Sequence, residues 1–380
     1  MKTAIVILNW NGQKLLEQFL PSVVNFSLDE ATIYIADNAS TDDSVSYVKT
    51  HFPSVKIIKN SQNGGYSKGY NDALKAIDAD IYCLLNSDVE VTENWLKPIT
   101  EAFRNDINTA IIQPKLLDFK EKTKFEYAGA GGGFIDVFGY PYCRGRIFNY
   151  LETDHGQFDD ETEIFWASGA CLFIRSKVYH EVGGLDEDYF AHQEEIDLCW
   201  RTQNLGYKVK YVGSSSVYHV GGATLKETNP HKTFLNFRNS LLNVVKNVPK
   251  ERFLFVIFSR LLLDGIAGLK FIIELRPIHT LAIIKAHISL YKNSIKFLKK
   301  RRFWVRSISI LILIPLILST VLISLLYWKQ DQVVQELLHT LNKDFEGHFE
   351  IGESHISPFK NFPYISIDLE NLTLYENDTK

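Results

Sequence analysis

Residues Ile81 to Glu90 read IYCLLNSDVE, an apolar run that ends abruptly in Asn86-Ser87-Asp88. An apolar run of this length, bounded by polar turn residues, predicts a buried β-strand. In an open α/β sheet, ligands bind beyond the carboxyl ends of the strands. Asp88 is therefore predicted to bring a carboxylate to the ligand-binding edge of the sheet, although an aspartate here could also do no more than shape a turn.

The residues before this stretch alternate between apolar runs and segments of helical periodicity. Further strands are predicted at Thr3–Leu8, Ala31–Ala36 and Val55–Lys59, and helices at Lys14–Val24 and Asn71–Ile77. Such alternation favours a parallel sheet in a doubly wound α/β fold.

Polar residues follow the other predicted strands as well. Asn9 and Asn11 come after the first strand and Asp37 after the second, where an acid can bind a ribose hydroxyl or a base edge, or cap a helix. The loop Asn63-Gly64-Gly65 lets backbone amides approach a ligand near a helix N-terminus that favours phosphate. These groups make a nucleotide a plausible ligand. NAD binding and ATP hydrolysis are not expected, because the sequence has neither the dinucleotide fingerprint nor the P-loop pattern.

Composition narrows the class of protein. The chain has 380 residues, 46% of them hydrophobic, and a net charge of −4, which gives no general nucleic-acid signal. Its four cysteines form no CxxC pair, so we expect reduced core thiols rather than disulfides or a zinc site. Met1-Lys2 leads directly into a strand-like run, and no signal peptide is expected.

The composition changes near residue 250. Residues 251–298 are rich in Phe, Leu and Ile but are interrupted by charges, which favours amphipathic helices in a membrane interface, with a helical cap on a soluble core as the alternative. A basic cluster at 299–302 precedes about 22 uncharged residues, Ser307 to Trp328, enough to cross about 30 Å of hydrocarbon. The expected domains are 1–247, 248–303, a transmembrane helix at 304–328 and a tail at 329–380. By the positive-inside rule, we expect a single-pass protein of the inner membrane with its N-terminal domain in the cytoplasm.

A second acidic motif lies in HQEEIDLCWR (192–201), which is predicted to form a helix. Glu194, Asp197 and Arg201 fall on one face, which is predicted to be a solvated salt-bridge face. Glu195 is instead followed, three and four positions later, by the apolar residues Leu198 and Cys199. Its side chain is therefore predicted to point toward the apolar side of the helix. Desolvation and nearby acids raise the pKa of a carboxylate, and a raised pKa suits a general base.

Together these motifs resemble those of the inverting family 2 glycosyltransferases with the GT-A fold. The likeness rests on VILNWNG (6–12), DNASTDDS (37–44), NGGYSKGYNDAL (63–74), LLNSDV (84–89), WASGACLFIRS (166–176), GGLDEDYFAHQEEIDLCWR (183–201), VYHVGG (217–222) and NFRNSL (236–241). It covers roughly residues 1–247 and is strongest for the bacterial rhamnosyltransferase-like members that build cell-surface polysaccharide.

The resemblance implies a divalent metal, Mg²⁺ or Mn²⁺, that bridges the donor diphosphate. Asn86-Ser87-Asp88 matches the family's D-x-D motif with its first acid replaced by Asn86, so Asp88 would bind the metal and His219 would complete its ligand shell. The nucleotide-sugar donor would be bound by Asn9, Asn11, Asp37, Asn63, Gly64, Gly65 and Ser87.

For the chemistry, the resemblance places the catalytic acid pair at Glu194-Glu195, with Glu195 as the base that deprotonates an acceptor hydroxyl. That oxygen would attack the anomeric carbon opposite the leaving nucleoside diphosphate, so the anomeric configuration would invert. The acceptor side would be lined by Trp166, which offers a sugar-stacking face, and by Ser168, Gly169 and Ala170; a buried core strand is the competing interpretation of this segment. Residues 129–146 are interpreted as a mobile loop over the site.

The predicted function is transfer of a sugar, with rhamnose as one candidate, from a UDP-, GDP- or dTDP-sugar to a glycan or lipid-linked acceptor at the membrane. Two alternatives stay open: a sugar-nucleotide pyrophosphorylase, and an inactive membrane-bound sugar-binding module. Nucleic acid is not an expected partner. The tail ISPFKNFPYISIDLENLTLYE (356–376) resembles the N-terminus of AsmA-like membrane proteins.

Overall fold

The computed structural model describes residues 1–148, 150–189, 191–221, 229–301, 328, 347–350, 352–361, 364–371 and 373–376. The chain divides into two compact units, residues 1–304 and 305–380. Each unit is described by itself.

The first unit is built on a mixed β-sheet. Its first four strands are parallel in the order β3–β2–β1–β4, as the alternating pattern predicts: β1 (Thr3–Asn9), β2 (Ala31–Asp37), β3 (Lys56–Lys59) and β4 (Ile81–Asn86). Beyond β4 come β12 (Cys171–Arg175), β6 (Thr109–Asp118), β13 (Lys208–His219) and β11 (Glu161–Glu163), and β5 (Val89–Val91) pairs with β13.

The parallel pairing predicted from these four strands is confirmed, but it does not continue beyond β4, because β12 runs antiparallel to both β4 and β6. The reason lies just before this strand. The carbonyl of Ala170 accepts a hydrogen bond from the backbone of Asn86 at 2.9 Å. The chain therefore turns beside the carboxyl end of β4 and runs back along it, which places residues 168–170 at the ligand-binding edge.

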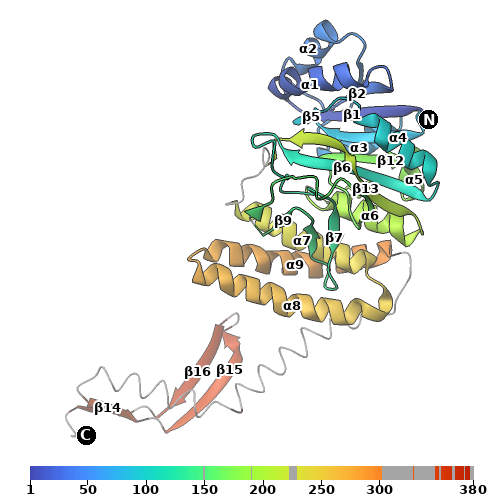
Figure 1. Ribbon diagram of the computed structural model, residues 1–380. Coiled ribbons are helices and arrows are strands. Elements are labelled where there is room, and N and C mark those ends of the chain that lie inside the picture. Colours follow the sequence, from blue (N-terminus) through green and yellow to red (C-terminus); the bar gives the residue numbers. More distant parts are fainter. Residues whose placement is uncertain are drawn as a thin grey trace. The chain divides into compact units, whose positions relative to one another are not determined.

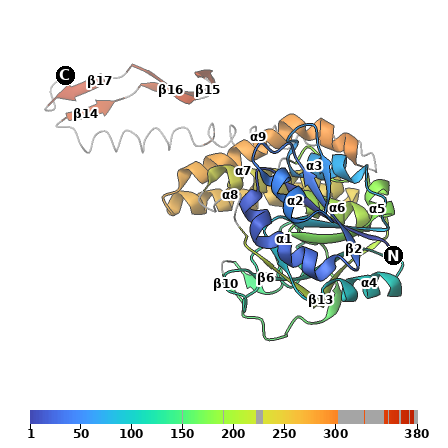
Figure 2. The ribbon, with the colours of Figure 1, turned by 90° about the horizontal axis from the view of Figure 1, so that it is seen from above.

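Helices cover both faces of the sheet (Figures 1 and 2). Alternate residues of a strand point to opposite faces, so Ile5 and Ile7 join one core cluster and Ala4 and Val6 the other. The first cluster is closed by α1 (Gln13–Ser27), α2 (Ser44–His51) and α4 (Leu96–Asn105), and the second by α3 (Gly65–Leu74), α5 (Ser176–Glu181) and α6 (Glu194–Asn204).

Two predicted local features differ from the structure. Helix α3 begins at Gly65, six residues earlier than predicted, so its N-terminus stands directly in the loop that carries Asn63. Residues 129–146 contain strands β7 (Gly133–Ile135) and β8 (Pro141–Cys143), which pair as a hairpin instead of forming a simple loop, while β9 (Arg146–Ile147) pairs with β10 (Tyr150–Leu151). Gly133 also bridges to Trp166, which fastens the hairpin to the sheet.

Three long helices complete the first unit: α7 (Pro230–Asn247), α8 (Lys250–Ile273) and α9 (Pro277–Lys300). Helix α7 packs against α6 and also against α8 and α9 (Figure 1). Among the described residues, no helix has the length and apolar character needed to span a bilayer. The transmembrane helix predicted at 304–328 falls almost entirely outside the described residues, and it stays a prediction.

The described residues of the second unit form two strand pairs. Strand β14 (Gly347–Glu350) pairs with β17 (Thr373–Glu376), and β15 (Glu353–Asn361) pairs with β16 (Tyr364–Glu370). The resemblance of this segment to AsmA-like proteins stays a prediction.

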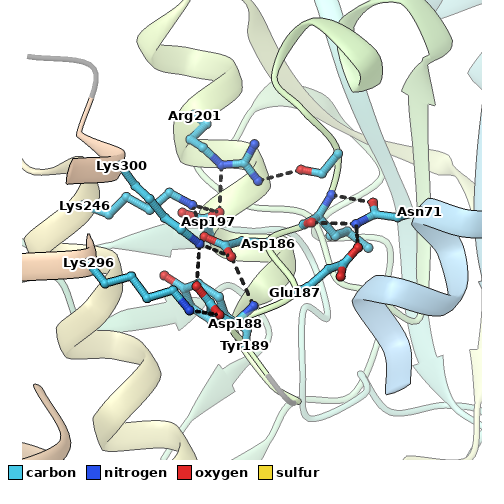
Figure 3. Close-up of polar contacts among 12 residues, drawn as sticks. Asn71, Asp186, Glu187, Asp188, Tyr189, Asp197, Arg201, Lys246, Lys296 and Lys300 are labelled. Atoms are coloured by element: carbon cyan, nitrogen blue, oxygen red, sulfur yellow. Dashed lines mark hydrogen bonds and ion pairs between the residues drawn. The ribbon is translucent and has the colours of Figure 1, made fainter. Parts of the chain in front are cut away.

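A buried ion cluster fastens α6 to the C-terminal helices (Figure 3). Asp197, which is fully buried, accepts from Arg201 at 2.7 Å and from Lys246 of α7 at 2.8 Å. Lys246 and Lys300 of α9 also pair with Asp186. Burial alone would raise the pKa of Asp197, but the positive charges of Arg201 and Lys246 lower it. The predicted solvated face of α6 is therefore wrong: α7 covers it.

We predict that Asp197→Asn destabilises the first unit by about 3–5 kcal/mol, because two buried cations lose the charge that compensates them. The matched control is Asp72→Asn, which breaks the partly exposed pairs with Lys68 and Lys75 and should cost about 0–1 kcal/mol. Denaturant unfolding followed by tryptophan fluorescence compares the two variants. Equal losses of unfolding free energy in the two variants would contradict a central role for Asp197.

Candidate active site

The carboxyl edge of the sheet gathers polar side chains from four strands. Asn9 ends β1, Asp37 ends β2, Asp88 follows β4, and His219 ends β13. The parallel pairing sets Asn9 opposite Asp37, and β13 brings His219 opposite Val89. The sequence motifs on these strands therefore converge at one edge, as a doubly wound fold requires.

Asn9 and Asp37 form one side of this edge. The Asn9 amide donates to Asp37 at 3.3 Å and to the hydroxyls of Ser40 and Ser44. Its carbonyl oxygen, Oδ1, is buried without a hydrogen-bond partner and lies against Gly12, where a Cβ atom would stand only 2.6 Å away. Asn11 has another task, because its side chain accepts from the backbone of Thr41 at 2.7 Å.

The loop at 63–65 lies beside Asp37. Asn63 accepts a hydrogen bond from Asn38, the neighbour of Asp37, at 2.9 Å and another from the Gly65 amide at 3.0 Å. Gly65 has a φ of 77°, a left-handed conformation that favours glycine at the start of α3. The loop and the β2 end therefore form one continuous surface at the N-terminus of a helix, where backbone amides favour an anion.

Asp88 and His219 meet on the other side of the edge. Nε2 of His219 lies 3.2 Å from Oδ1 of Asp88, and Nδ1 lies 3.4 Å from Oε1 of Glu126. All three side chains are buried. Burial alone would lower the pKa of His219, but the two carboxylates raise it to about 10. The two carboxylates thus already face one cation, the protonated imidazole, and a metal ion at His219 would have to displace the proton on Nε2.

The acid pair begins α6. Glu194 is 6% exposed, with Oε2 buried and unpartnered, while Glu195 is more accessible. Burial and the neighbouring Glu195 raise the pKa of Glu194 well above its ordinary value, and burial raises the pKa of Glu195 to about 7. The structure thus reverses the predicted orientation, since Glu194 rather than Glu195 is the more buried carboxylate.

Gly169 brings the acceptor segment against this pair. A Cβ atom on Gly169 would stand 3.0 Å from the hydroxyl oxygen of Tyr66 and 3.9 Å from Cβ of Glu195. The Tyr66 hydroxyl donates to the Gly169 carbonyl at 2.8 Å. Tyr66 lies in α3, directly after the loop at 63–65 that is predicted to bind the nucleotide sugar. Through Tyr66 and Gly169, this loop is therefore close to Glu195, the predicted base.

The other acceptor residues are mostly structural. Trp166 is only 5% exposed, its ring packs on Gly133, and its N–H donates to Phe134 at 2.7 Å. It therefore fills the core instead of offering a face to a sugar. The competing interpretation of a buried core strand holds for the residues that follow, where Cys171–Arg175 form β12. Ser168 is buried too, with its backbone amide bound to Gln113 at 2.7 Å. Of the predicted acceptor residues, Gly169 is the one that lies against Glu195.

The backbone before α6 is strained and is held by α7. His192 and Gln193 both have left-handed φ values, 69° and 70°, which cost about 1–3 kcal/mol each for non-glycine residues. The fully buried amide of Asn239 donates to the carbonyls of Ala191 and His192 at 2.8 and 2.7 Å. Asn239 thereby sets the position from which Glu194 and Glu195 project.

Sequence reasoning did not assign three of these residues: Glu126, Tyr66 and Asn239. Tyr66 and Asn239 lie inside quoted motifs, NGGYSKGYNDAL and NFRNSL, so their position in a motif was a usable signal. Glu126 lies in no motif, and only the pairing of its segment with β6 brings it to His219.

The fold and the site together define a class of protein. The unit has the GT-A glycosyltransferase fold: it is similar to the S. aureus TarS 1–349 structure in complex with UDP-GlcNAc, with a TM-score of 0.52 and 14% identity over 79% of this chain and 84% of that one. Residues 4–183 match the family described as Glycosyl transferase family 2. The chain thus carries a family 2 glycosyltransferase domain, and the protein is a glycosyltransferase.

Two curated relatives agree. N-acetylglucosaminyl-diphospho-decaprenol L-rhamnosyltransferase of Mycobacterium tuberculosis is 25% identical over 233 residues, which cover 57% of this chain and 75% of the relative. The low-salt glycan biosynthesis hexosyltransferase Agl10 of Haloferax volcanii is 21% identical over 247 residues, covering 63% and 74% respectively.

We predict that Asn239→Ala lowers kcat by about 10²-fold, because the start of α6 relaxes and the acid pair is misplaced. The KM for the donor should change little, since the strand ends that face the donor are untouched. Asn293→Ala, which removes a hydrogen bond within α9, is the control. A folded Asn239→Ala variant with normal kcat would contradict the positioning role.

Proposed function

We propose that the protein is an inverting glycosyltransferase that moves a sugar from a nucleoside diphosphate sugar to a hydroxyl of a cell-surface glycan or lipid-linked acceptor, with Glu195 as the general base. Rhamnose is the first sugar to test, because a relative is named as an L-rhamnosyltransferase. The proposed location is the cytoplasmic side of the inner membrane.

One observation carries this proposal: a carboxylate with a pKa of about 7 lies beside Gly169 and Tyr66, next to the edge where the strand ends converge. A base of this pKa is largely available near neutral pH and can still accept a proton. Glu195 would take the acceptor hydroxyl's proton as that oxygen attacks the anomeric carbon from the side opposite the leaving group. Burial and the neighbouring Glu195 raise the pKa of Glu194 well above its ordinary value, and its Oε2 is buried, so the more accessible Glu195 would be the working base.

The donor would lie along the carboxyl edge. The orphaned carbonyl of Asn9 and the carboxylate of Asp37 suit hydroxyl and N–H donors of a nucleoside. The start of α3 at Gly65 presents backbone amides to the diphosphate. Ser87 lies between the last residue of β4, Asn86, and Asp88. We therefore retain it as a residue that would contact the nucleotide sugar.

A divalent ion, Mg²⁺ or Mn²⁺, fits the chemistry of the Asp88–His219 pair, since carboxylate and imidazole are ligands that Mn²⁺ accepts. Among the described residues, no group of three His, Cys, Asp or Glu side chains could hold an ion, so the donor phosphates would have to complete the shell. When bound there, such an ion would supply positive charge to offset the charge of the leaving nucleoside diphosphate. Glu126 would accept the Nδ1 proton of His219 and so keep Nε2 directed at the ion.

We predict that Glu195→Gln lowers turnover about 10²–10⁴-fold while donor binding persists. In the unmodified enzyme, kcat/KM should rise about tenfold per pH unit up to about pH 7 and then level off, because only the deprotonated carboxylate is active. The assay is nucleotide release from UDP-, GDP- and dTDP-sugars, with and without Mn²⁺. The exposed carboxylate of Glu181 supplies the matched control, Glu181→Gln, and unchanged turnover in Glu195→Gln would overturn the assignment.

We also predict that Glu126→Gln weakens Mn²⁺ binding about 10–100-fold, because His219 loses the carboxylate that orients it. Free Mn²⁺ is measured by electron paramagnetic resonance in the presence of UDP, so the readout does not depend on turnover. Glu121→Gln, a change at an exposed carboxylate, should leave binding intact. Equal affinity in the Glu126 and Glu121 variants would remove Glu126 from the metal site.

A further inference from the structure

Helix α8 has its polarity inverted relative to a helix that faces water. Its end residues Lys250, Glu251, Arg252 and Lys270 are exposed, but the two charged residues in its middle, Arg260 and Asp264, are fully buried. Between these ends, the exposed positions from Leu254 to Leu269 are apolar apart from Gly265. A surface helix of a water-soluble protein buries its apolar stripe and exposes its charges.

The buried charges of α8 are fully engaged on the protein side. Arg260 donates to Ser240 of α7 at 2.8 Å and pairs with Asp264 at 3.3 Å. Asp264 also accepts from Tyr140 of the β7–β8 hairpin at 2.5 Å and lies 3.0 Å from Nε2 of His287 of α9. This network fixes the rotation of α8, so its apolar side is held outward.

The outward side of α8 continues onto α9. On α8 the exposed apolar residues recur every three or four positions, the spacing of a single helix face. Figure 1 shows α8 and α9 side by side, with α8 at the part of the unit farthest from α1 and α2. We call this surface the α8–α9 face; its side chains are between 42% and 89% exposed, and they are Leu254, Phe255, Phe258, Leu262, Ile266, Leu269, Ile272, Ile273, Leu275, Ile278, Leu281, Ile284, Ile288 and Ile295.

The charged residues of α9 indicate what kind of partner covers the α8–α9 face. Helix α9 contains five lysines and no acidic residue. Lys285, Lys292 and Lys299 are exposed and seven residues apart, so they form a row along the helix. The apolar row Leu281, Ile288 and Ile295 lies four residues before it, about 40° around the helix. No ion pair engages these three lysines within the described part of the chain.

An apolar row beside a row of lysines matches a helix that lies in a bilayer interface, with the apolar side chains at the acyl boundary and the cations at anionic headgroups. A second copy of this chain would instead bring two lysine rows together. The sequence after α9 points the same way, since Ser307 to Trp328 has no charged residue.

We propose that the α8–α9 face docks onto the surface of an anionic lipid bilayer. The docking stands apart from the transfer chemistry, and it would present the active site of a docked enzyme to acceptors that are themselves anchored in lipid.

The test uses the full chain with single cysteines, Leu262→Cys on α8 and Ile284→Cys on α9, each labelled with a polarity-sensitive fluorophore. The four native cysteines are buried, which limits background labelling. The matched control is Ile107→Cys, an exposed apolar position on the sheet domain. The vesicles are phosphatidylcholine with phosphatidylglycerol, with or without a nitroxide on the acyl chain.

With vesicles, the emission of both helix probes should shift to the blue, and the acyl-chain nitroxide should quench it, while the Ile107 probe should stay unchanged. Replacing Lys285, Lys292 and Lys299 by Gln should reduce the quenching on anionic vesicles but not the residual quenching on pure phosphatidylcholine. Unquenched helix probes on a chain that floats with vesicles would overturn the proposal. A blue shift without lipid would also overturn it: one that grows with protein concentration identifies a second copy as the occupant, and one independent of concentration identifies another part of this chain.

Discussion

The carboxylate of Asp197 is the point on which the rest of this structure depends. It is fully buried and holds Arg201, Lys246 and Asn247, so it joins α6 to α7 by charge rather than by apolar packing alone. Arg201 in turn donates to the carbonyls of Val182 and Gly184. Lys300 of α9 pairs with Asp186 and Asp188, which precede α6 in the chain. The helix that begins with the acid pair is therefore fixed from its buried side, and its first turn is left to face the ligand edge.

Much of the fold and part of the site could be predicted from the sequence because the signals are local. The strands β1 to β4 follow from apolar runs ended by polar residues, and parallel pairing then brings Asn9, Asp37 and Asp88 to one edge. The antiparallel β12 and the burial of Asp197 could not be predicted, since both depend on which segments pack together. A helix face with an acid and an arginine four residues apart looks solvated until a distant helix, here α7, covers it. Glu126 shows the same limit, because its meeting with His219 is set by strand pairing alone.

The C-terminal helices α7, α8 and α9 link the acid pair of α6 to the apolar α8–α9 face. On their inner side they carry Asn239 and Lys246, which position α6, and on their outer side they present the apolar α8–α9 face. The buried network of Arg260, Asp264 and Tyr140 lies between these sides and reaches the β7–β8 hairpin, which is bridged to Trp166. The buried network of α8 is therefore connected through ordered contacts to the segment that precedes β12.

The central claim is that Glu195 acts as a base in a single displacement, and the configuration of the product tests it most directly. With a donor of known anomeric configuration, NMR of the first product formed should show the opposite configuration at the transferred sugar's anomeric carbon. A product that retains the donor's configuration would contradict the account, because it would require a second displacement or a different geometry of attack from the one that Glu195 supports.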